Sequence, residues 1–60
     1  MNISDQELRD VYPYFIEGMK SAVKRGIYKS LDEIPGRYRK DEPDYADLLE
    51  KVVALYHSME

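Results

Sequence analysis

The chain has 60 residues, no cysteine, one histidine and a formal net charge of −3. This length predicts a single domain over residues 1–60, and the lack of cysteine excludes disulfides, thiolate metal sites and cysteine redox chemistry. A histidine-based metal cluster is excluded as well. Because a fold this small buries only about 60% of its unfolded surface, we expect helix packing or self-association to stabilise it.

The first predicted helix covers residues 5–25. Ser4 and Glu7 have the spacing of a capping box, which starts a helix at the residue after the serine. Pro13 falls on the polar side of this helix, and the apolar side chains keep the same phase before and after it. We therefore expect one helix that is kinked at Pro13 and ends at Gly26. The alternative is that Pro13 begins a second helix.

The apolar arc of this helix consists of side chains at helical spacing: Leu8, Val11, Tyr12, Phe15, Ile16, Met19, Ala22 and Val23. Gly18 lies within this arc. It either allows another backbone to approach closely or is a glycine that the helix tolerates.

The connector is predicted to contain one short capped helical turn over residues 31–34. Ser30 and Glu33 repeat the capping-box spacing, but Pro35 and Gly36 stop the helix that they open. The turn contributes two apolar side chains to the core, Leu31 and Ile34. Residues 36–40 are predicted to form an exposed loop.

The last predicted helix covers residues 43–58. Asp41 or Glu42 caps it, and Pro43 suits its first turn. Its apolar arc is wider than a two-helix seam requires, and consists of Tyr45, Leu48, Leu49, Val52, Val53, Leu55, Tyr56 and Met59. The fold class predicted is all-α: two amphipathic helices with the short capped turn between them, forming a helical hairpin. Because neither wide arc is covered in so short a chain, we expect the hairpin to dimerise into a four-helix bundle.

Charge is unevenly distributed along the chain. Residues 20–40 carry seven bases and two acids, whereas both flanking segments are acidic. The acidic ends either neutralise this segment, within the fold or across a dimer, or leave it free to bind a partner. Tyr14 falls off the apolar arc, beside Ser21 and Arg25, which is typical of a contact anchor or of a scattered surface aromatic. The candidate partner-binding residues are Tyr14, Lys24, Arg25, Tyr28, Lys29, Arg37, Tyr38, Arg39 and Lys40.

Catalytic chemistry is not predicted. No serine sits in a nucleophile elbow, and His57 lies near a helix C-terminus, where it complements the dipole. The acids at the start of the last helix lack the ligand pattern of a calcium loop, and the isolated glycines form no phosphate loop. We therefore expect no enzyme, no catalytic residue, no cofactor and no metal site.

One segment carries a resemblance. The stretch GIYKSLDEIPGRYR, residues 26–39, resembles a segment of short, uncharacterised proteins encoded by phages and prophages of Gram-positive bacteria. The matching residues are Gly26, Ser30, Asp32, Glu33, Ile34, Pro35 and Arg39, and Gly36 departs from the acidic residue usual at its place. The resemblance implies a mobile-element accessory or regulatory protein that works by binding.

These observations favour a non-enzymatic interaction module, an adaptor, inhibitor or regulator that self-associates as a homodimer. It would bind an unidentified protein through the basic connector. The alternative is a small nucleic-acid-binding regulator that uses residues 20–40, although a sequence pI of about 5.0 disfavours binding to phosphates. A polar, acidic N-terminal segment and the lack of a long apolar run indicate a cytoplasmic protein with no membrane span.

Overall fold

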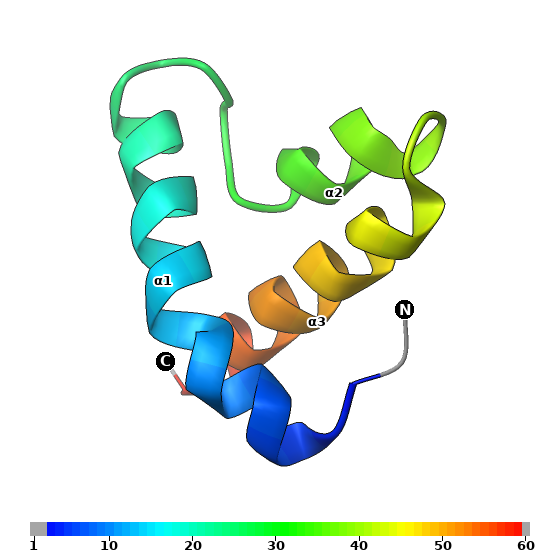
Figure 1. Cartoon of the computed structure of the whole chain (residues 1–60). Helices are drawn as coiled ribbons and strands as arrows, with labels where there is room; N and C mark the ends of the chain where they lie inside the picture. Colours follow the sequence, from blue (N-terminus) through cyan, green and yellow to red (C-terminus); the bar gives the residue numbers. More distant parts are fainter. Residues whose placement is uncertain (1–2, 60) are drawn as a thin grey trace.

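The computed structural model describes residues 3–59; residues 1, 2 and 60 of the predicted domain lie outside the described part. The chain forms three helices, α1 (Asp5–Lys24), α2 (Glu33–Arg39) and α3 (Pro43–Met59) (Figure 1). Residues 3–59 contain no strand. The predicted all-α fold class is therefore confirmed.

α1 begins and ends as its sequence predicts. The Ser4 hydroxyl oxygen accepts a hydrogen bond from the Glu7 N–H at 3.1 Å, and the Glu7 carboxylate accepts one from the Ser4 N–H at 3.5 Å. At the other end, Gly26 has a φ of 81°, and its N–H donates to the Val23 carbonyl at 3.0 Å, as in the glycine-terminated helix ends that satisfy the last carbonyls. Both ends of α1 are fixed by local chemistry.

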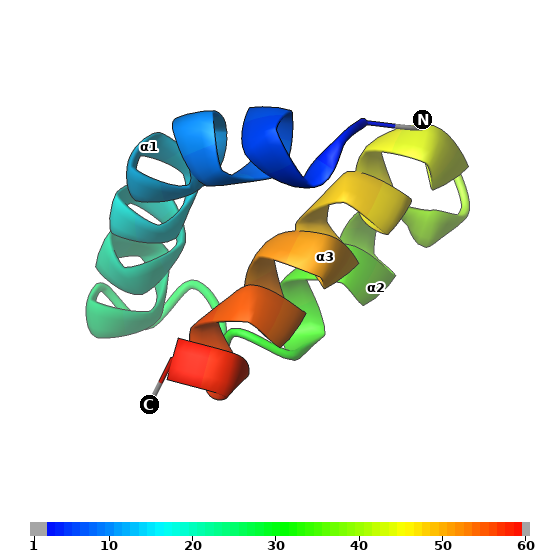
Figure 2. The same ribbon diagram turned by 90° about the horizontal axis from the view of Figure 1, so that it is seen from below.

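α1 also passes through Pro13 without interruption. Figure 2 shows that α1 bends in its first half, where Pro13 lies. A proline removes one backbone hydrogen bond and pushes against the preceding turn, which bends a helix. The single kinked helix is confirmed, and the alternative of a second helix beginning at Pro13 is wrong.

α2 corrects the predicted connector. The helix covers Glu33–Arg39 rather than a turn over 31–34, so the exposed loop predicted from residue 36 is wrong as far as residue 39. Pro35 is the third residue of α2. The N–H groups of a helix's first turn have no acceptor within the helix, so a proline there costs no hydrogen bond. Pro35 is buried in the start of the helix instead of stopping it.

The predicted capping box at Ser30 is also wrong. Asp32 is the N-cap residue of α2 and makes no side-chain capping bond. The Glu33 N–H donates instead to the backbone carbonyl of Ser30, at 3.3 Å. A backbone turn thus replaces the expected side-chain cap.

α3 lies at the centre of the packing. It contacts α1 and, more extensively, α2. The predicted pairing of the two long helices is present, and α2 adds a third packed helix (Figure 1). The core cluster consists of Ile16, Met19, Ile34, Leu49, Val52 and Val53, with Leu31 packed against it. None of the helices in residues 3–59 has the length and apolarity needed to cross a bilayer.

Candidate interaction surface

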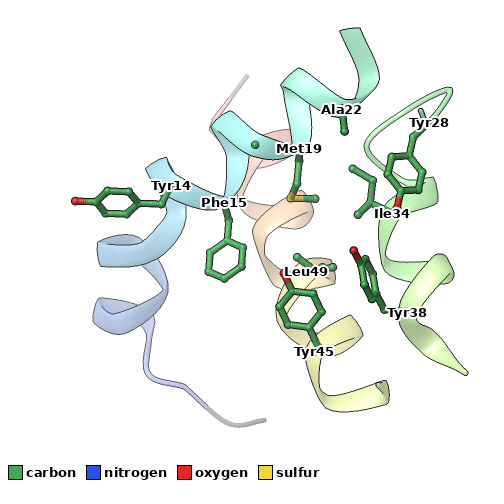
Figure 3. Close-up of a pocket in the computed structure, with 10 residues that line it drawn as sticks. Tyr14, Phe15, Met19, Ala22, Tyr28, Ile34, Tyr38, Tyr45 and Leu49 are labelled. Atoms are coloured by element: carbon green, nitrogen blue, oxygen red, sulfur yellow. The ribbon is translucent and has the colours of Figure 1, made fainter. Parts of the chain in front are cut away.

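An open groove with a volume of about 240 Å³ lies where α1 faces α2 and α3 (Figure 3). Most of its lining is aromatic or apolar: Tyr14, Phe15, Gly18, Met19, Ala22, Tyr28, Ile34, Tyr38, Tyr45 and Leu49. We call it the aromatic groove. Met19, Ile34 and Leu49 belong to the core, so the floor of the groove is the core itself, reached from solvent.

The aromatic rings of the groove come from all three helices and the first connector. Tyr38 meets Tyr45 edge-on, with ring centroids 5.0 Å apart, and Phe15 lies 6.2 Å from Tyr45 in a tilted arrangement. Such edge-on pairs are favourable beyond the area that they bury. Tyr28 lies at the far end of the row, where its hydroxyl points toward that of Tyr38 (Figure 3). These ring contacts help to fix the positions of α1, α2 and α3 relative to one another around the groove.

Two of these phenols are harder to ionise than usual. Burial raises the pKa of Tyr28, and the neighbouring Tyr38 raises it further. Burial likewise raises the pKa of Tyr45, with Tyr38 and Glu42 adding to the effect. Near pH 7 both side chains are therefore neutral, and they offer hydrogen bonds rather than a base.

A charged side chain lies near each of these two phenols. Arg37 is close enough to Tyr28 to lower the pKa of its phenol electrostatically, against the larger effect of burial. Glu42 is close enough to Tyr45 to raise the pKa of that phenol. Arg37 and Glu42 are both exposed. A cation thus lies near Tyr28 and a carboxylate near Tyr45.

The α1 wall of the groove is open to solvent. Tyr14 is 80% exposed and its ring points away from the groove floor (Figure 3). A β-carbon placed on Gly18 would meet no atom within 4 Å, so the space above this part of the helix is empty. The predicted position of Tyr14 off the apolar arc agrees with its exposure.

The nine candidate residues fall into three groups. Three tyrosines line the groove: Tyr14, Tyr28 and Tyr38. Five cations are exposed along the segment from the end of α1 to the end of α2, and within residues 3–59 none of them pairs with a carboxylate: Lys24, Arg25, Lys29, Arg37 and Lys40. Arg39 forms the third group, because it faces α3 and forms ion pairs with Asp47 and Glu50.

Sequence reasoning missed seven lining residues, which are Phe15, Gly18, Met19, Ala22, Ile34, Tyr45 and Leu49. Except for Gly18, they were assigned to the apolar arcs of the two long helices or, for Ile34, to the core, and burial in the core is right for Met19, Ile34 and Leu49. The available signal was the tyrosine content, six in 60 residues. Such a density favours a contact surface, because tyrosine combines apolar area with a polar tip.

His57 lies in the last turn of α3, as predicted for a side chain that complements the helix dipole. Its Nε2 atom is 3.1 Å from the Asp32 carboxylate, so it also connects the end of α3 to the start of α2. Over the part of the chain that the structure describes, no three histidine or carboxylate side chains are grouped to hold a metal ion.

Comparison with known proteins adds no relative to this description. No protein-family model matches the chain, and no curated protein or solved structure is significantly similar to it. The interpretation of the groove therefore depends on its own geometry.

Proposed function

We propose that this protein is a non-enzymatic protein–protein interaction module that self-associates and binds a second protein. Its contact surface is the aromatic groove together with the basic connector, which we define as the exposed cations Lys24, Arg25, Lys29, Arg37 and Lys40. In this proposal it acts in the cytoplasm as an adaptor, inhibitor or regulator, with a mobile element as its setting.

The observation that carries the proposal is an open aromatic groove beside cations that have no partner carboxylate within residues 3–59. Tyrosine and arginine dominate the binding energy of protein interfaces, because each contributes contact area and directed polar groups. Among residues 3–59, the lining of the groove contains no carboxylate or imidazole, and its half-buried phenols Tyr28 and Tyr45 are neutral near pH 7. This composition supports binding rather than catalysis.

The chemistry of the surface also selects the partner. The five cations of the basic connector favour a protein surface that carries carboxylates, with apolar side chains placed to enter the groove. Interfaces of this kind use charge for orientation and association rate, and buried apolar anchors for affinity.

Nucleic acid is the second candidate, because cations and aromatic rings together are typical of single-strand binding sites. Stacking requires an exposed ring face. Tyr28 and Tyr38 are partly buried against the core cluster, which leaves Tyr14 as the exposed aromatic on this side. The arrangement therefore favours protein over nucleic acid.

The test is affinity capture from native lysate with the full chain, with and without nuclease. The first variant is the triple substitution Lys29→Ala, Arg37→Ala and Lys40→Ala. Its matched control removes three cations that lie outside the basic connector, Arg9→Ala, Lys20→Ala and Lys51→Ala. We expect a defined protein that persists after nuclease, is lost with the first variant and is retained by the control.

Three results would change the proposal. Equal capture by wild type and the basic-connector variant would exclude this surface. Equal loss with both triple variants would mean that the effect follows net charge alone. Capture that disappears with nuclease, with an affinity that falls steeply as salt rises, would favour the nucleic-acid candidate.

A further inference from the structure

The end of the aromatic groove at Ala22 carries an exposed apolar side chain, Ile27. Behind Gly26 the chain turns back, and the Ile27 N–H donates to the Ala22 carbonyl at 3.0 Å. In helix ends of this kind, the residue in the position of Ile27 often packs against the residue in the position of Ala22. Ala22 lines the groove, yet the Ile27 side chain is 62% exposed. Ile27 therefore extends the apolar lining of the groove at this end.

Three segments of the chain place a cation around the same end. Arg25 lies three residues after Ala22, so it continues the stripe of α1 that lines the groove. Lys29 directly follows the groove-lining tyrosine of the connector. Arg37 lies three residues after Ile34 on α2, next to the face of that helix that lines the groove. All three are exposed, and none pairs with a carboxylate within residues 3–59.

The groove itself has room for one large side chain. Its volume of about 240 Å³ lies below the range of about 300–1,000 Å³ that is typical of small-molecule sites. The Met19 side chain, with its sulfur, lies at the centre of the lining residues (Figure 3). A thioether sulfur and the edges of neighbouring rings both make favourable contacts with an aromatic ring. A single aromatic side chain is therefore the guest that this lining suits best.

We infer that the partner protein contributes a short acidic segment, of which one aromatic side chain enters the groove while neighbouring carboxylates contact Arg25, Lys29 and Arg37. This inference rests on the proposed function and specifies the segment that its surface binds. The ring supplies the buried apolar area, and the carboxylates orient the segment and speed its association. Ile27 is a contact residue of this site that its helical position alone does not indicate.

A nucleotide also combines a ring with negative charge, but the rings of the groove disfavour it. Bases bind single-strand sites by stacking on exposed ring faces. The rings inside the groove are partly buried against the core cluster, and the exposed ring of Tyr14 points away from the groove floor (Figure 3). A side chain that inserts among ring edges needs no exposed ring face, so the arrangement favours a peptide segment.

The first experiment uses the lack of tryptophan in the chain. The probe is an acetylated and amidated peptide with one tryptophan between glutamates, and its indole emission is distinct from any signal of the protein. Addition of the full chain should shift this emission to shorter wavelength, because the indole leaves water. A peptide with lysine in place of each glutamate should bind roughly tenfold more weakly or worse. A peptide with alanine in place of tryptophan should fail to displace the probe.

The second experiment tests the assigned residues with matched variants. Ile27→Ser should weaken binding of the probe several-fold. Its control is Met59→Ser, because the Met59 side chain is similarly exposed, at 65%, but lies on another surface, beside Arg9 and Leu55. Both variants change exposed side chains, and both should keep the helical circular dichroism of wild type.

A third variant fills the groove. Nothing lies within 4 Å of a β-carbon at Gly18, so Gly18→Gln is compatible with the fold but occupies the space of the guest ring. It should weaken binding of the probe roughly tenfold or more. The control is Gly36→Gln, since Gly36 also has open space around it but lines a surface near Asp32 and Glu50. This control should bind the probe like wild type.

The outcomes separate this inference from the proposed function. Absence of an emission shift, or equal affinity for the glutamate and lysine peptides, overturns the acidic aromatic segment. Equal effects of Ile27→Ser and Met59→Ser, or of the two glycine variants, overturn the assigned site. An oligothymidine that displaces the probe at lower concentration than unlabelled peptide assigns the site to nucleic acid. If the probe fails to bind while capture from lysate still depends on the basic connector, the proposed function stands without this segment.

Discussion

The guanidinium of Arg39 donates a hydrogen bond from Nη1 to Oδ1 of Asp47 at 2.5 Å, which joins the last residue of α2 to the first turns of α3. The other terminal nitrogen forms an ion pair with Glu50, one turn further along α3. Two carboxylates on one guanidinium fix the orientation of α2 better than a single pair does. One cation of the basic middle segment is thus neutralised within the fold.

This contact predicts an acid-dependent loss of stability. The hydrogen bond from Arg39 is the main reason that the pKa of Asp47 lies below its ordinary value. The ionised Asp47 stabilises the folded chain at pH values above the ordinary carboxyl value, and this stabilisation is lost as the pH falls through the lowered folded-state value. Arg39→Ala should therefore lower the urea midpoint at pH 7 slightly, and it should reduce the further decrease of the midpoint as the pH falls.

The control for this prediction is Arg9→Ala, which removes an exposed cation that has no ion pair within residues 3–59. This variant should leave the decrease of the urea midpoint at low pH unchanged. Urea unfolding followed by circular dichroism from pH 2 to 7 measures both. If the urea midpoint decreases with falling pH in the same way in wild type and in Arg39→Ala, the Asp47 contact does not contribute to stability.

The capping box of α1 gives a second prediction. Ser4→Ala removes the hydroxyl that accepts the Glu7 N–H, and loss of such a cap costs about 0.5–2 kcal/mol. Ser21→Ala is the matched control, because Ser21 is exposed within the same helix and alanine has the highest helix propensity. Urea unfolding should show the loss for the first variant and no loss for the second. If both variants lose the same stability, the loss comes from replacing a serine by alanine in general and not from removing the cap.

The packing of α3 gives a third prediction. Leu49 is 2% exposed and contacts the core from the helix that touches both others. Leu49→Ala leaves a cavity and should cost about 2–5 kcal/mol, against a total on the order of 3–9 kcal/mol for a chain of this size. The variant should therefore lose a large share of its free energy of unfolding, which urea unfolding followed by circular dichroism measures. Leu55→Ala, at a half-buried position of the same helix, should stay folded and lose less; the reverse order would place the core elsewhere.

Local chemistry explains which parts of the fold were predictable. Ser4 and Glu7 are three residues apart, and Gly26 follows Arg25, the C-cap residue of α1, so short stretches of sequence determine both ends of this helix. The connector was misread because Pro35 was taken as a stop. A proline in the first turn and a proline beyond the last look the same in sequence, and only the burial of Pro35 against the core distinguishes them.

The groove was beyond prediction for a different reason. Its rings come from residues 15, 28, 38 and 45, which three helices and a loop bring together. Tyr14 could be separated from the apolar arc by its helical position alone. Tyr45 could not, because its spacing in α3 suits the core, and its place at the groove depends on how α1 and α2 pack across it.

The raised pKa of Tyr45 gives the last prediction, an alkaline loss of stability. Burial is the main cause of the shift, since it disfavours the charged phenolate. A group whose folded-state pKa exceeds its unfolded value contributes stability that is fully present below the unfolded value, about 10 for tyrosine, and is lost as the pH rises through the folded value. The urea midpoint should therefore fall above about pH 10. Tyr45→Phe should reduce that fall, and Tyr14→Phe, at an exposed position, is the control for loss of a phenol hydroxyl. Ultraviolet absorbance of tyrosinate, recorded in parallel, should lose a late-titrating component in Tyr45→Phe. If Tyr45→Phe leaves both the absorbance titration and the alkaline fall of the urea midpoint unchanged, burial in the groove does not shift the Tyr45 phenol.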